Sequence, residues 1–61
     1  MTDAEARAIA LEAAERVYAE TRKAQIADGK DPAARPCRDE AFLAANNEYT
    51  RVYVAKLEAQ P

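Results

Sequence analysis

The segment DGKDPAARP, residues 28–36, separates two alanine-rich stretches of a 61-residue chain. It contains Gly29, the single glycine, and two of the three prolines, Pro32 and Pro36. Glycine readily adopts the left-handed conformation that ends many helices, and a proline disfavours helix at the residue before it. We therefore expect a linker over residues 29–36 with a helix on either side.

The flanking stretches predict helices over about 3–28 and 37–59, because alanine, glutamate, arginine and leucine favour helix. Thr2 and Glu5 have the spacing of a capping box. Pro36 suits the start of the second helix, and we expect Asp39 and Glu40 in its first turn, where negative charge suits the helix dipole. The predicted fold class is all-α, a two-helix antiparallel hairpin forming a single domain over residues 1–61.

The linker permits this hairpin without enforcing it. Eight extended residues reach roughly 26 Å, well beyond the 8–10 Å that separates packed helices. An open dimer that exchanges helices therefore stays an alternative.

Each predicted helix has a broad apolar face when side chains are placed at about 100° per residue. On the first helix an alanine-rich stripe adjoins a second stripe of larger residues. On the second helix, bulky residues and all its tyrosines share one stripe, with Asn46 among them. We expect these stripes to supply the packing interface, with the candidate residues Ala10, Leu11, Ala14, Val17, Tyr18, Phe42, Asn46, Tyr49, Tyr53 and Leu57.

The chain is too short to bury a large core by itself. One cysteine, Cys37, excludes a disulfide within the chain, and the absence of histidine excludes imidazole ligands for a metal. Association is the remaining common route to stability for such small chains. We expect a homodimer that forms a four-helix bundle.

The sequence argues against an enzyme. Without serine or histidine, Ser-His and Cys-His pairs are impossible within the chain. Glu12 and Glu15 have the spacing of a carboxylate pair, but such sites need further ligands from facing helices, and this pair falls on the predicted solvent face. We expect no catalytic residue, no metal ligand and no cofactor. A carboxylate site assembled from several chains is the alternative that remains.

Cys37 lies between Arg35 and Arg38 near the predicted start of the second helix. Two cations and a helix N-terminus would favour a reactive thiol, so a redox role or a disulfide across a dimer is one hypothesis. The simpler interpretation, which we favour, is a small residue near the linker, away from both apolar stripes and without a role.

Charge is unevenly spread along a chain whose formal net charge is −2. Residues 22–38 carry five basic and two acidic side chains. The basic ones form a candidate patch for an anion or an acidic partner, namely Arg22, Lys23, Lys30, Arg35 and Arg38. The same residues complement the end of the first helix dipole.

Two function classes follow from these features. The favoured hypothesis is a non-enzymatic helical module for oligomerisation or protein interaction. The alternative is a small nucleic-acid-binding regulator, because two helices per chain in a dimeric bundle is similar to the plan of Rop-type plasmid copy-number regulators. No sequence motif supports that analogy, and the glutamate-rich outer face of the first helix opposes it. We expect no membrane contact and a cytoplasmic location, since neither a signal peptide nor a long apolar run is present.

Overall fold

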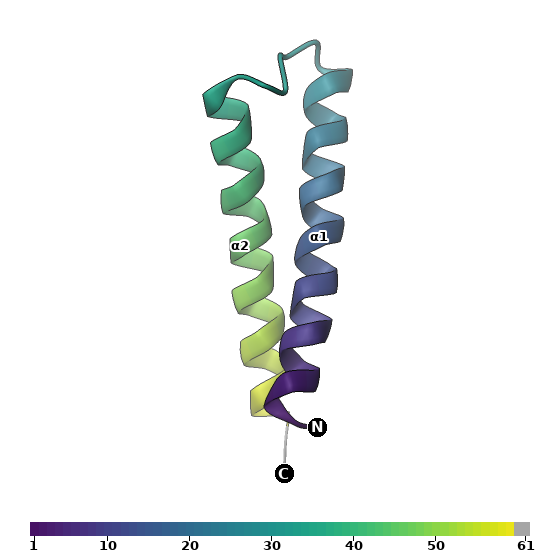
Figure 1. Ribbon diagram of the computed structural model, residues 1–61, viewed down its shortest axis with the longest axis vertical. Helices are drawn as coiled ribbons and strands as arrows, with labels where there is room; N and C mark the ends of the chain where they lie inside the picture. The colour runs from purple at the N-terminus through teal and green to yellow at the C-terminus, as the bar shows by residue number, and fades with distance from the viewer. Residues whose placement is uncertain (60–61) are drawn as a thin grey trace.

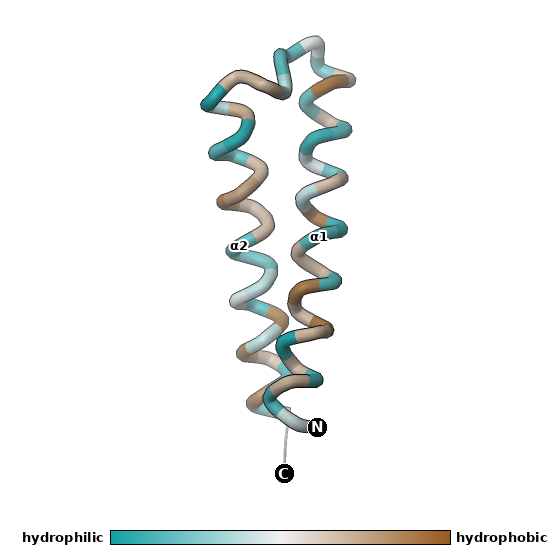
Figure 2. The backbone as a smooth tube through the Cα atoms, viewed as in Figure 1, coloured by the Kyte–Doolittle hydropathy of each residue, from teal (hydrophilic) through white to brown (hydrophobic). Residues whose placement is uncertain are grey.

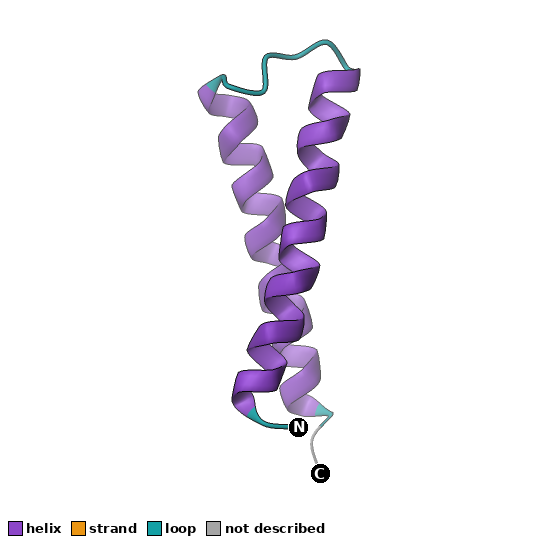
Figure 3. Ribbon diagram, turned by 45° about the vertical axis from the view of Figure 1, so that its right-hand side comes forward, coloured by secondary structure: helices purple, strands orange, loops and turns teal. Residues whose placement is uncertain are grey.

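A computed structural model describes residues 1–59, which form two helices packed antiparallel to each other (Figure 1). Helix α1 spans Asp3–Ala27 and helix α2 spans Arg35–Glu58. The start of α1 and the end of α2 lie at one end of the hairpin and the linker lies at the other, and the described residues contain no strand (Figure 3). The expected all-helical antiparallel hairpin is confirmed.

Both ends of α1 follow the sequence signals. Thr2 caps the helix, because its Oγ1 accepts a hydrogen bond from the Glu5 amide at 3.1 Å and its own amide donates to Glu5 Oε1 at 3.3 Å. At the other end Gly29 has a φ of 77°, the left-handed conformation expected of it. The Lys30 amide then donates to the Gln25 carbonyl, so that the helix ends in a Schellman motif.

The linker is held by its own hydrogen bonds before α2 begins. Asp31 Oδ1 accepts from the Ala33 amide at 3.0 Å, and the Asp31 carbonyl accepts from the Ala34 amide at 3.0 Å. Helix α2 starts at Arg35, two residues earlier than expected, with Pro36 in its first turn. The first turn consequently contains no acidic residue, so the expectation that Asp39 and Glu40 occupy it is wrong.

Small side chains are the most deeply buried part of the contact between the two helices. We call these residues the seam: the buried Ala6, Ala10 and Ala14 of α1 with Cys37 and Ala41 of α2. Ala6, Ala10 and Ala41 are fully inaccessible to solvent. Because alanine and cysteine have short side chains, the two backbones can approach closely along the seam.

The packing of α2 corrects one expectation. Phe42 is 59% exposed and Leu57 is 38% exposed, so the hairpin covers the bulky stripe of α2 only in part. Cys37 was expected away from the apolar stripes, yet it is buried in the seam at 8% exposure. The contact within the hairpin uses the smaller residues and leaves much of the bulky stripe on the surface.

No helix within residues 1–59 combines the length and the apolar character that crossing a membrane requires.

Candidate protein-interaction face

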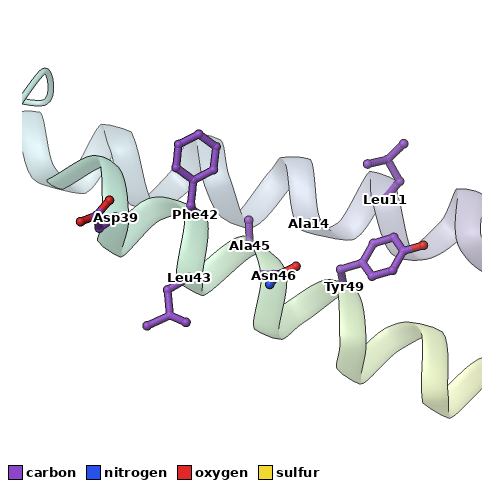
Figure 4. A pocket seen from close by; sticks show the side chains of 8 residues that line it. All are labelled: Leu11, Ala14, Asp39, Phe42, Leu43, Ala45, Asn46 and Tyr49. Atoms are coloured by element: carbon purple, nitrogen blue, oxygen red, sulfur yellow. The ribbon is translucent and has the colours of Figure 1, made fainter. Parts of the chain in front are cut away.

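An open groove runs along one side of the hairpin, over the middle of both helices (Figure 4). Its volume is about 540 Å³. The residues that line it come mainly from α2, and they are Leu11, Ala14, Asp39, Phe42, Leu43, Ala45, Asn46 and Tyr49. We call this side of the molecule the groove face.

Large apolar side chains at the groove are exposed to solvent. Leu11 is 53% exposed, Phe42 is 59% exposed and Leu43 is 62% exposed. Figure 4 shows Phe42 directed toward α1 and Leu43 directed away from it. Figure 2 shows hydrophobic segments at intervals along both helices. An apolar cluster of this kind on a small protein typically marks a binding surface.

Aromatic contacts hold the sides of the groove in place. The Tyr18 and Phe42 rings, one from each helix, have centroids 5.4 Å apart. The Tyr49 and Tyr53 rings of α2 are 5.9 Å apart. These distances are typical of favourable aromatic pairs, so both contacts favour the observed side-chain positions beside the groove.

Charged side chains lie at both ends of the apolar surface. Toward the chain termini, the Arg7 guanidinium lies 5.9 Å from the Tyr53 ring centroid and pairs with Asp3 at 2.9 Å. The Tyr53 hydroxyl donates a hydrogen bond to Asp3. The hydrogen bond with Tyr53 and the neighbouring Asp3 carboxylate raise the pKa of Arg7.

Toward the linker, Arg22 lies over the Tyr18 ring with 5.8 Å between the guanidinium carbon and the ring centroid. Its Nη1 atom is buried and has no hydrogen-bond partner within residues 1–59. Asp39 lines the groove at the same end and makes a long 3.8 Å ion pair with Arg35. At this end, Arg22 therefore has a buried nitrogen without an acceptor, and Asp39 has only a long ion pair.

The predicted interface residues divide between two surfaces. Ala10 and Ala14 are buried in the seam, and Val17, Tyr18, Tyr49 and Tyr53 are half-buried beside it. Leu11, Phe42, Asn46 and Leu57 are exposed, and the first three line the groove together with Ala14 and Tyr49. The sequence analysis did not identify Asp39, Leu43 and Ala45 as groove residues.

The residues of the predicted basic patch differ in exposure. Arg22 is half-buried on the groove side, whereas Lys23, Lys30, Arg35 and Arg38 are exposed around the linker end. Asp39 lies 3.8 Å from Arg35, so one acidic side chain lies beside this basic residue. Glu12 and Glu15 are exposed on α1, and no cluster of three potential metal ligands occurs in the described part of the chain.

In comparisons with known proteins, no family model, no curated protein and no solved structure matches this chain.

Proposed function

We propose that this chain is a non-enzymatic helical association module that forms a homodimer, a four-helix bundle, through its groove face. The observation that carries the proposal is the division of side chains between two surfaces. Small residues hold the hairpin together, while Leu11, Phe42 and Leu43 remain more than half exposed on the groove face. Apolar side chains that cluster in one exposed patch typically mark an interaction surface.

The accessible surface supports association. The chain exposes 4441 Å² to solvent. A compact monomer of the same mass exposes about 3900 Å². The excess arises because the hairpin is a single layer of two helices, 46 Å long and about 15 Å across. A face of those dimensions is of the same order as the ~800 Å² that each partner contributes to a standard stable interface.

A second copy is the occupant that fits this face best, because both partners then bring the same mixture of bulky and small residues. Phe42 and Tyr49 supply bulk, and Ala14 and Ala45 leave room for it. Alternating large and small residues across facing helices is the usual basis of a well-packed bundle. A nucleic-acid role receives no comparable support, since the basic residues are dispersed and Arg35 already has an acidic neighbour.

The test is the mass in solution. Sedimentation equilibrium should give about twice the 6.7 kDa chain mass, and the melting temperature should rise with protein concentration, as association requires. Phe42→Asp should shift the protein to the monomer. Ile26→Asp is the matched control, because Ile26 is 61% exposed but does not line the groove.

A single-chain mass at every concentration would overturn the homodimer, as would equal effects of the two aspartate variants. Titration with labelled duplex DNA and RNA tests the alternative class. We expect no binding tighter than the non-specific range of ~10⁻⁴–10⁻⁶ M at physiological salt.

A further inference from the structure

Helices α1 and α2 are aligned so that residues of one stand level with identifiable residues of the other. Three contacts set this alignment: Arg7 meets Tyr53, Tyr18 meets Phe42, and Gln25 meets Cys37. Toward the linker, residue numbers rise along α1 and fall along α2, so each increase of one on α1 corresponds to a decrease of one on α2. By the same alignment Ala14 stands level with Asn46, Leu11 with Tyr49, and Arg22 with residues 38–39.

Two hairpins that meet face to face around a two-fold axis have two simple arrangements. With the axis along the hairpin, both linkers lie at the same end and α1 of one copy faces α2 of the other. With the axis across the hairpin, the linkers lie at opposite ends and each helix faces its own counterpart. An isologous interface must be self-complementary, so charges and side-chain sizes distinguish the two arrangements.

We propose that the dimer places both linkers at the same end and pairs Arg22 of each copy with Asp39 of the other. This inference rests on the proposed dimer and specifies its geometry. In this arrangement every residue of α1 faces the α2 residue that is level with it, now in the second copy. Arg22 thereby faces Asp39, so that opposite charges meet at the linker end of the dimer.

The state of Arg22 and Asp39 in one chain supports this pairing. Arg22 is held over Tyr18 with a buried nitrogen that has no acceptor. Asp39 is the charged residue among those that line the groove, and its 3.8 Å contact with Arg35 is long. No ion pair joins Arg22 to Asp39 within residues 1–59. A second copy would supply each group with an opposite charge.

Side-chain sizes favour the same arrangement. With the linkers together, Ala14 faces Asn46, so a small residue meets a larger one, and the exposed Leu11 faces Tyr49. With the axis across the hairpin and centred on Ala14 and Asn46, Ala14 would face Ala14 of the second copy, so that small would meet small at the centre. The bulky face of α2 would also meet itself. Arg22 would then lie opposite Ala6 of the second copy, next to Arg7, and like charges close to each other destabilise an interface.

Charge reversal tests the pairing. Arg22→Glu and Asp39→Arg should each raise the dimer dissociation constant about tenfold, because two symmetric attractions become repulsions. The double variant Arg22→Glu/Asp39→Arg should recover most of the loss, since the charges are exchanged but remain opposite. Lys23→Glu and Glu40→Arg are matched controls at neighbouring exposed positions outside the groove, and should change the dissociation constant little.

A distance measurement tests the arrangement without relying on those variants. A spin label on Lys30→Cys, in a Cys37→Ala background, should give a distance between the two labels well below the 46 Å length of the hairpin. A distance near that length, or a tighter dimer in Arg22→Glu, would overturn the same-end arrangement while leaving the homodimer intact. Loss of dimerisation in the unmodified protein would instead overturn the proposed function.

Discussion

The Nε2 atom of Gln25, near the end of α1, donates a 2.7 Å hydrogen bond to the backbone carbonyl oxygen of Cys37, in the first turn of α2. Gln25 is 2% exposed, which makes it the buried polar side chain of the seam region. Because a carbonyl can only accept, this bond fixes which end of the Gln25 amide points to α2. The Oε1 atom is left buried without a donor.

Gln25→Ala should destabilise the folded chain by about 2 kcal/mol, because it removes a buried hydrogen bond and leaves a cavity. Gln25→Met keeps most of the volume and also removes the buried oxygen that lacks a partner. Its cost should be smaller, about 1 kcal/mol or less. Urea denaturation at one fixed protein concentration measures both, and equal stability of Gln25→Ala and the unmodified chain would show that the bond contributes nothing.

Enlarging the seam should separate the helices. Ala41→Leu places bulk at a position with no accessible surface, and overpacking of this kind costs about 1–3 kcal/mol. Ala19→Leu is the matched control, since Ala19 is exposed and both variants have similar helix propensity. A melting temperature that falls equally in both variants would contradict the assignment of Ala41 to the seam.

Burial of Cys37 changes the expectation for its thiol. Cys37→Ser should lower stability by about 1–3 kcal/mol, because a hydroxyl enters a buried site. For a domain of this size each kcal/mol corresponds to a shift of about 4–8 °C in melting temperature. The native thiol should react slowly with an aromatic disulfide reagent and quickly in urea, since access requires local opening. Rapid modification of the folded protein would be incompatible with the buried position.

The sequence predicted the elements of this fold better than their packing. The Thr2–Glu5 capping box and Gly29 carry local signals, because each acts through the backbone within a few residues. The seam of α2 carries no comparable signal. Its small residues, Cys37 and Ala41, contribute little to apolar periodicity, and the larger Phe42 and Tyr49 beside them dominated the pattern.

The sequence predicted some of the residues that line the groove. Leu11, Phe42 and Tyr49 were identified because bulky apolar residues stand out at helical spacing. Asp39 was assigned to the helix dipole, since only the alignment of the two helices shows that it lines the groove. Gln25 was missed entirely, although it continues the helical face of Ala14 and Thr21 toward the linker. A polar residue on a small-residue stripe is the signal that could have found it.

Stability should depend on pH through Glu48. Arg51 donates two hydrogen bonds to its carboxylate, at 2.8 Å and 3.0 Å, and this lowers the pKa of Glu48 below its ordinary value of 4.5. A lowered folded-state pKa contributes stability that is present above the ordinary value and disappears as pH falls through the lowered one. The effect should be small, because the pair lies at the surface.

Glu48→Gln isolates that contribution. The variant should melt below the unmodified chain near neutral pH, and the difference should disappear well below pH 4.5. Thermal scans across this range measure it, with Arg51→Gln as the partner variant. A melting difference that stays constant over the whole range would show that the ion pair is not its source.

Asn46 lies at the middle of the groove, exposed in the single chain and, in the proposed dimer, opposite Ala14 of the second copy. Burying an amide there costs stability unless it finds a partner, but it can fix register and oligomeric state. Asn46→Leu should therefore raise the melting temperature of the dimer and permit additional assembly states, visible as species larger than the dimer in sedimentation velocity. Asn47→Leu is the matched control, because the neighbouring asparagine is exposed outside the groove. A lower melting temperature for Asn46→Leu, with the dimer unchanged, would contradict this prediction. It would mean that Asn46 makes essential hydrogen bonds across the interface, and that its amide stabilises the dimer instead of determining the oligomeric state.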